Sequence, residues 1–337
     1  MKRNAFIDNG KLILVTLVVF VHLIQPFTDD KTYVYAVYMW THIFLMPVFI
    51  LLTGFFAKGK SDKAFLMNLV KKLLIPYFIF QTLYTAYYFM IGKSGWLTES
   101  LFYPHWALWF LVSLFCWHIL LIGFKRLKPA YGILLAFAIG IAVGYIDQIG
   151  HLFSLSRTFV FFPFFLIGHH LTEEHFKMVK RQKVKIAGFM ILGFVLIGLA
   201  ILPEIPIGWL LQSKSYDTLN AGLFGGLGRM AVYLVAVAMT IGILAWIPQE
   251  RFRFTYLGER TLYVYLLHGF IVQLFRQFDL LYVQTPFDLF ALLILSIGIV
   301  FVLSTNVVMA IWQPVIELRA RLLKGRLQSK ANNQKMV

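Results

Sequence analysis

The sequence has few charged residues and a single cysteine. Only 14% of its 337 residues are charged and 60% are hydrophobic, whereas soluble domains carry roughly a quarter charged residues. A soluble chain of this composition could not cover its surface with polar groups. The lone Cys116 excludes an internal disulfide framework and any multi-cysteine metal site. We therefore expect no metal centre and no redox role.

Long apolar segments take the place of the missing charge. Residues 12–27, 186–202 and 287–312 each approach the roughly 20 apolar residues that a helix needs to cross a bilayer. The sequence therefore predicts an all-α fold, a polytopic membrane helix bundle of about ten transmembrane helices. The expected spans are 10–27, 37–57, 73–91, 106–124, 130–147, 157–172, 184–202, 229–247, 261–276 and 287–313.

Acidic residues are scarce too, and the net charge is +16. If the N-terminus is cytoplasmic, all but six of the 31 Lys and Arg residues fall on the cytoplasmic side. This asymmetry is the positive-inside pattern of an even number of spans, with both termini cytoplasmic. The basic excess thus reflects topology, so we expect membrane lipids and no nucleic acid as partners. The six exceptions are Lys31, Lys93, Arg157, Lys214, Arg229 and Arg276, about one per outer connection.

One membrane domain, residues 1–323, is the simplest division of the chain. The polar segment 324–337 is expected to be a disordered cytoplasmic tail. The longest outer connection, 203–228, contains Trp209 and Tyr216 and ends in a glycine-rich stretch. It either covers a site from outside or is a plain flexible loop.

Polar residues in the first span share one face of the expected helix. At 100° per residue, Asp8, Lys11, Val15, Val18 and His22 fall within a stripe about 80° wide. His22 lies roughly 16 Å beyond Lys11 along the axis. Titratable groups at such depth are functional candidates. The alternative is that Lys11 snorkels to the headgroups beside Asp8 while His22 is a hydrogen-bonded core histidine.

Two further spans carry titratable residues at comparable positions. His42 lies about as far from the outer end of its expected helix as His22 does from its own, so the two imidazoles can share one depth. In the span 261–276, Thr261, Tyr265 and His268 share one face by their i, i+4, i+7 spacing. Tyr265 and His268 are either substrate-binding residues or a packing and hydrogen-bonding pair.

Several short motifs are similar to those of one membrane family. The chain resembles the integral membrane acyltransferase-3 family, in particular its fucose 4-O-acetylase-like branch. The resemblance covers nearly the whole chain. The order and spacing of the motifs are more specific than any single motif. The matching segments are 7–11 with His22, 42–49, 53–55, 71–77, 106–111, 164–168 and 258–268.

The resemblance implies an enzyme that transfers an acyl group, usually acetyl from acetyl-CoA, to a hydroxyl of a cell-envelope sugar. It implies His22 as the catalytic general base, a task that suits an imidazole, with His42 beside it. Lys11, Lys71 and Lys72 stand where relatives carry arginines, and with Asp8 they are the expected acyl-CoA contacts. Lysine keeps the positive charge but lacks the two-pronged fork that matches a phosphate.

The same resemblance gives each substrate a side of the membrane. Acyl-CoA enters from the cytoplasm as a co-substrate, with no tightly bound cofactor, and an extracytoplasmic or lipid-linked glycan enters from outside. Trp106 and Trp109 are expected to stack on a sugar, or else to anchor their helix at the headgroups. The expected location is a bacterial plasma membrane, together with polysaccharide-synthesis proteins.

A transporter or flippase for an envelope polysaccharide or its lipid-linked precursor is the alternative function, because multispan bundles with inward-facing polar residues also build substrate paths. The sequence contains no matching pair of interrupted helices in its two halves. A purely structural scaffold would not need titratable stripes at depth. Acyl transfer is therefore the favoured prediction.

Overall fold

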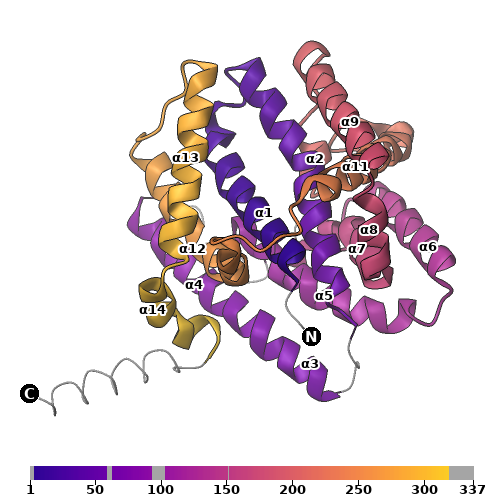
Figure 1. Ribbon diagram of the computed structural model, residues 1–337, viewed down its shortest axis with the longest axis horizontal. Coiled ribbons are helices and arrows are strands. Elements are labelled where there is room, and N and C mark those ends of the chain that lie inside the picture. Colours follow the sequence, from indigo (N-terminus) through magenta and orange to yellow (C-terminus); the bar gives the residue numbers. More distant parts are fainter. Residues whose placement is uncertain (1–3, 59–62, 93–102, 151, 319–337) are drawn as a thin grey trace, which may run out of the picture.

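The computed structural model describes residues 4–58, 63–92, 103–150 and 152–318, so the expected tail at 324–337 lies outside it. Every regular element in these ranges is a helix, which confirms the all-α prediction (Figure 1). Among these residues, seven helical segments are long and apolar enough to cross a membrane: Ala5–Phe27, Thr32–Phe55, Ala64–Met90, Trp106–Phe124, Gln182–Ile201, Gly222–Trp246 and Pro286–Leu303.

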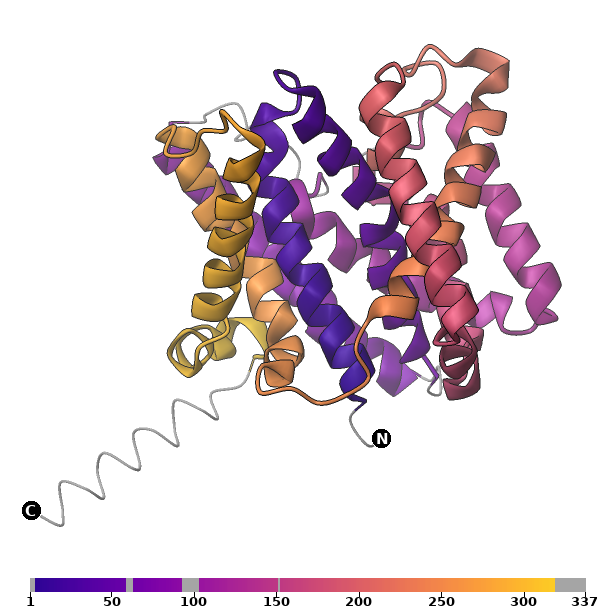
Figure 2. The ribbon, with the colours of Figure 1, turned by 45° about the horizontal axis from the view of Figure 1, so that its top comes forward.

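Three shorter helices occupy the remaining expected spans. They are α6 (Pro129–Ala142), α7 (Leu155–His170) and α12 (Thr261–Gln277). The count of ten spans, like the orientation of the termini, stays a prediction. Figure 2 shows the start of α1 and the short α14 (Asn306–Ile316) at the same end of the bundle, as an even number of crossings requires.

The centre of the bundle is formed by α1 (Ala5–Ile24), extended by the 3-10 turn η1 (Gln25–Phe27), and by α2 (Thr32–Phe55) (Figure 2). Both helices begin about five residues earlier than expected. The Asn4 side chain caps α1 by accepting a hydrogen bond from the Phe6 amide at 3.1 Å. Asp8 and Lys11 are therefore helical residues. The apolar runs in the sequence identify only the part of each helix that is buried in lipid or in the protein core. They therefore leave out the more polar first turns.

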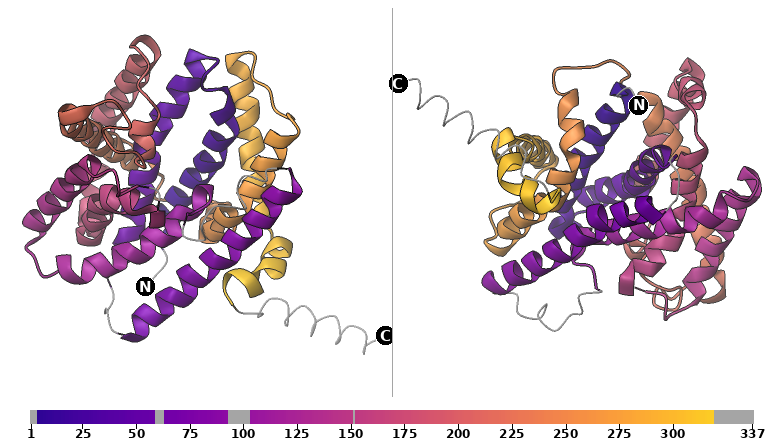
Figure 3. Two further views of the ribbon diagram at one scale, coloured as in Figure 1. Left: turned by 180° about the vertical axis from the view of Figure 1, so that it is seen from behind. Right: turned by 90° about the horizontal axis from the view of Figure 1, so that it is seen from below.

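Two groups of helices flank this pair (Figures 1 and 3). On one side lie α12, α13 (Pro286–Leu303), α14 and a long helix made of α3 (Lys63–Leu69), the π turn η2 (Val70–Leu74) and α4 (Ile75–Met90). On the other side lie α6, α7, α8 (Glu173–Val179), α9 (Gln182–Ile201) and α11 (Gly225–Trp246), while α5 (Trp109–Phe124) runs between the groups.

The structure corrects two expected boundaries. The span expected at 287–313 is interrupted, because α13 ends at Leu303 and Thr305 caps a separate α14 by accepting from the Val308 amide at 3.4 Å. The helix expected to begin at 73 begins ten residues earlier, at Lys63. Lys71 and Lys72 therefore lie on exposed positions of the π turn and not in a loop. An amphipathic helix can run along the headgroup layer before it enters the apolar layer, so hydropathy alone misses its start.

Two glycines from the matching motifs let α2 and α7 touch through their backbones. A Cβ atom on Gly54 would lie 2.1 Å from the Phe165 carbonyl oxygen, and one on Gly168 would lie 2.0 Å from the Leu51 carbonyl oxygen. Small residues allow this close approach between membrane helices. The contact fixes α7 against α2, and both helices contribute residues to the cavity described next.

Candidate active site

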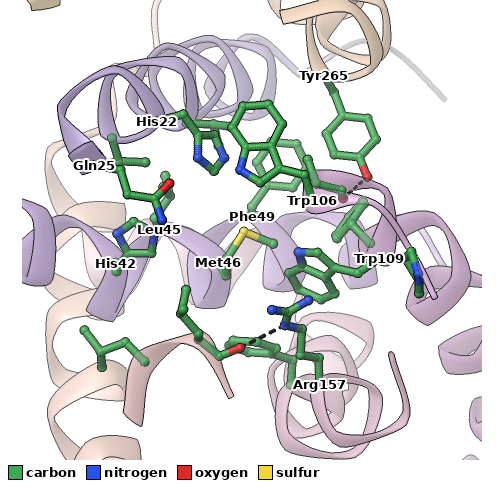
Figure 4. A pocket seen from close by; sticks show the side chains of 18 of the residues that line it. His22, Gln25, His42, Leu45, Met46, Phe49, Trp106, Trp109, Arg157 and Tyr265 are labelled. Carbon is green, nitrogen blue, oxygen red and sulfur yellow. Dashed lines mark hydrogen bonds between the residues drawn. The ribbon is translucent and has the colours of Figure 1, made fainter. Parts of the chain in front are cut away.

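A cavity of about 360 Å³ opens between α1, α2, α5, α7 and α12 (Figure 4). Most of its lining is apolar or aromatic. Five of the residues singled out in the sequence line it together, namely His22, His42, Trp106, Trp109 and Tyr265. Residues that are far apart along the chain thus converge in one chamber.

The cavity follows one face of α1. Val15, Val18 and His22 all line it, as the predicted stripe requires. Lys11 lies one turn before Val15 and is not part of the lining; its Nζ lies 4.7 Å from the centre of the Phe56 ring. Asp8 is buried and also lies outside the lining. The His22 end of the stripe therefore lines the cavity, and the charged end, with Asp8 and Lys11, lies just outside it.

The His22 imidazole packs against aromatic rings. Its centroid lies 4.0 Å from that of Trp106 and 5.6 Å from that of His268, which is stacked on it. Within the described part of the chain, no hydrogen bond engages the buried Nδ1. The Arg276 guanidinium instead donates to the His22 backbone carbonyl. These contacts disfavour the alternative of a hydrogen-bonded core histidine.

The other two histidines differ from His22. His42 Nδ1 lies 3.0 Å from the Tyr38 carbonyl oxygen, and His268 Nδ1 lies 2.9 Å from that of Val264. A carbonyl only accepts, so Nδ1 carries the proton in both rings and Nε2 is the acceptor nitrogen. His42 lines the cavity, whereas His268 is fully buried behind His22 and does not. The structure thus places His268 against the candidate base and outside the lining where a substrate would bind.

The two tryptophans form part of the cavity wall. Trp106 begins the 3-10 turn η4 (Trp106–Leu108) with φ of +44°, a left-handed conformation that is strained for a bulky residue. Its indole fits because position 269 is glycine, where a Cβ atom would lie 2.6 Å from the ring. Tyr265 secures the turn by donating its hydroxyl hydrogen bond to the Ala107 carbonyl. Trp109 stacks on Phe161 with centroids 5.6 Å apart.

Two arginines that the sequence places at the ends of expected spans, among the cations of the outer side, belong to this site. Arg157 is the third residue of α7, is only 8% exposed and lines the cavity. Arg276, in the last turn of α12, donates to His22 and, at 2.8 Å, to Gln25 Oε1. Neither arginine was predicted as a site residue from the sequence. Their presence on the side that the positive-inside rule leaves poor in cations was the signal that could have identified them.

The connection 203–228, which the sequence predicts to be outer, is packed against the bundle and closes part of the cavity. Leu210 and Leu211 of α10 (Gly208–Leu211) contribute to the lining. Tyr216 is fully buried, and its amide and hydroxyl donate to the carbonyls of Gly144 and Ile141, both at 2.8 Å. This packing agrees with the covering role considered from sequence, and the side of the membrane on which the connection lies stays a prediction.

The remaining predicted residues lie away from the cavity. Lys71 and Lys72 are exposed on η2, and neither lines it. Asn9, within the first motif, has a packing role that the sequence did not reveal. Its Nδ2 donates to the carbonyls of Pro248 at 3.0 Å and Glu250 at 2.8 Å, and thereby holds the segment before α12 against α1.

The comparisons with known proteins agree with this arrangement. A family model described as an acyltransferase domain (acyltransferase-3) matches residues 4–305, which is most of the chain. No curated protein and no solved structure matches significantly. The matched region contains every residue that lines the cavity. The chain therefore belongs to the acyltransferase-3 family of membrane-bound acyltransferases.

Proposed function

We propose that this enzyme transfers an acyl group, acetyl in the first instance, from cytoplasmic acyl-CoA to a hydroxyl of a cell-envelope glycan, with His22 as the general base. The observation that carries the proposal is the cavity along α1, which brings His22, His42 and Tyr265 together next to two tryptophans. The proposed location is a bacterial plasma membrane, beside the proteins that synthesise the glycan.

The donor path follows the stripe on α1. CoA phosphates are polyanionic and would remain with Lys11 and the exposed Lys71 and Lys72, outside the apolar cavity. The uncharged pantetheine arm would pass along Val15 and Val18 and bring the thioester to His22. Lys11 supplies charge without a two-pronged geometry, so the donor contacts are expected to be electrostatic and adaptable.

The proposed reaction is a base-assisted acyl transfer. An imidazole nitrogen of His22, which lines the cavity, takes the proton from the acceptor hydroxyl, and the oxygen attacks the thioester carbonyl carbon. The tetrahedral intermediate collapses with cleavage of the carbon–sulfur bond, which leaves the acylated sugar and a CoA thiolate. The imidazolium returns the proton to the thiolate, so the products are an ester and free CoA, and His22 is regenerated.

The acceptor end is rich in aromatic surface. The indoles of Trp106 and Trp109 line the cavity beside His22, and the 203–228 connection covers it. Aromatic faces suit the apolar faces of a sugar ring, and a covered site keeps water from competing for the thioester. His42, hydrogen-bonded through Nδ1, presents an acceptor nitrogen that can orient the hydroxyl.

The direct test replaces His22 with alanine in protein purified into lipid nanodiscs. Transfer of radiolabelled acetyl from acetyl-CoA to envelope glycans should fall about 10²- to 10⁴-fold, the typical value of positioned acid–base catalysis. Acetyl-CoA affinity should be nearly unchanged. His118→Ala is the matched control, because that histidine lies on α5 against Phe65 and Phe165, outside the cavity. Substantial turnover by folded His22→Ala protein would refute the role of His22.

A further inference from the structure

Arg157 places a buried cation in the wall of the cavity. Its Nε donates a 2.9 Å hydrogen bond to the Leu211 carbonyl, and its Cζ lies 5.1 Å from the centre of the Trp109 ring. Figure 4 shows the guanidinium next to the Trp109 ring, and Arg157 is one of the residues that line the cavity. One backbone carbonyl and one aromatic face therefore fix its position.

No acidic side chain neutralises this cation within the part of the chain that the structure describes. The cavity lining contains neither Asp nor Glu, and the ion pair found between described residues joins Arg251 and Glu259 elsewhere. A charged residue at the membrane-buried level is costly and is retained where it faces a cavity or a substrate path. The unmatched charge of Arg157 thus calls for an anion from outside the chain.

The hydrogen bonds of Arg157 also leave the outer edge of its guanidinium free to bind an anion. Those among the described residues use only Nε of Arg157, so the edge formed by Nη1 and Nη2 is open. Two parallel N–H groups match two oxygens of a carboxylate or a phosphate. Arg276 is different, because its Nη2 is already bound to His22 and Gln25.

We propose that Arg157 binds an anionic group of the acceptor, so that the natural acceptor is an acidic glycan bearing a carboxylate or a phosphate near the acylated hydroxyl. The inference rests on the proposed function. In that scheme the phosphates of CoA stay with Lys11, outside the cavity, and the acyl-pantetheine arm is uncharged. The anion at Arg157 therefore comes from the acceptor, and its binding orients the sugar between Trp109 and His22.

Ser156 is a matched control for the alternative that Arg157 has only a structural role. The neighbouring Ser156 donates its hydroxyl to the Gln212 carbonyl at 2.7 Å, and so holds the same outer segment to α7. Ser156 is buried and does not line the cavity. If Arg157 only holds this segment in place, Arg157→Gln and Ser156→Ala should have similar effects on every acceptor.

The test compares wild type, Arg157→Gln, Arg157→Lys and Ser156→Ala in nanodiscs with matched acceptor pairs. One pair is a uronic-acid oligosaccharide and its carboxyl-reduced form; the other is a glycerol-phosphate-substituted oligosaccharide and its dephosphorylated form. Wild type should prefer the acidic member of at least one pair, and which pair identifies the anion. Arg157→Gln should raise KM for that acceptor about 10- to 100-fold, the value of a charge-assisted contact, and should affect the acidic member of the pair much more than the neutral one. Arg157→Lys should recover part of the preference.

Binding of the same oligosaccharides without acetyl-CoA separates this inference from the proposed function. Acidic oligosaccharide that binds wild type and not Arg157→Gln, with no acetyl transfer by either, would refute the function and keep the anion site. Transfer by wild type with no preference for acidic acceptors would refute the anion site and keep the function. If Arg157→Gln and Ser156→Ala lost equal transfer activity on acidic and neutral acceptors, the anion site at Arg157 would also be refuted.

Discussion

At the level of single residues, the hydrogen bonds of the histidines distinguish His22 from the others. His42, His169 and His268 each hold Nδ1 within 3.0 Å of a backbone carbonyl oxygen, which commits that nitrogen as a donor. The ring of His22 has no such bond among the described residues, and its backbone carbonyl is anchored by Arg276. His22 is thus held by its main chain, and the residue lines the cavity.

A lysine outside the spans provides a pH-dependent prediction. Lys180 Nζ donates to the carbonyls of Ala245 and Ile247, and burial together with nearby Lys185 lowers the pKa of Lys180 from 10.5 to about 8. Below pH 8 both folded and unfolded chains carry the charge, and the folded state bears its cost. Between about pH 8 and 10.5 only the unfolded chain stays protonated, so this residue's contribution to stability should rise with pH.

The pH dependence of reaction with an amine-specific acylating reagent measures the pKa of Lys180 directly. Peptide mass spectrometry should show Lys180 modification with a midpoint near pH 8. Lys185→Gln removes a like charge and should move the midpoint upward. A midpoint above pH 10 in the native protein, or one insensitive to Lys185→Gln, would contradict the assignment.

At the level of helices, the glycines of the matching motifs matter for how closely α2 and α7 approach. The carbonyl oxygens of Phe165 and Leu51 occupy the space that a side chain at Gly54 or Gly168 would need. Since backbone and not a flexible side chain fills that space, alanine at either position must push the helices apart. The separation would also widen the cavity, because His42 and Arg157 lie on these two helices.

Gly54→Ala and Gly168→Ala should each lower the free energy of unfolding by about 1–3 kcal/mol or more, the usual cost of overpacking. Gly193→Ala on α9 is the matched control, because no atom lies within 4 Å of a Cβ atom there. That change should leave stability equal or raise it, as alanine favours a helix interior over glycine. Thermal unfolding in detergent, followed by tryptophan fluorescence, compares the three. Equal melting temperatures for all three variants would show that α2 and α7 do not pack this closely.

At the level of the whole molecule, the sequence predicted the helices well because hydropathy and the 3.6-residue period are local properties. The face of α1 that carries Val15, Val18 and His22 was predicted from the period alone, and the structure turns that face to the cavity. The beginnings of α1, α2 and α3 were missed, because polar residues can continue a helix into the headgroup layer. The break at Ser304 was missed because a cap depends on local hydrogen bonds within an apolar stretch.

Arg157 and Arg276 show where sequence reasoning ended. Each stands near the end of its helix, so its hydropathy pattern reads as a loop cation. Their roles depend on partners that are far away in sequence, Leu211 for Arg157 and His22 for Arg276. No single-helix pattern contains such pairings, because they follow from how the helices are placed against one another.

The topology decides which substrate meets which end of the cavity, and it gives the last prediction. In a Cys116→Ser background, cysteines at Asp217 and Gln284 should react with an impermeant thiol reagent added outside intact cells, and one at Gln182 should react only after lysis. All three positions are exposed. Figure 2 shows the segment 203–228 and the start of α9 at opposite ends of the bundle. The expected labelling follows from the basic residues, nearly all of which lie on the predicted inner side. The opposite labelling pattern would place Arg157 and the covering connection in the cytoplasm, and would exclude an extracytoplasmic acceptor at that end.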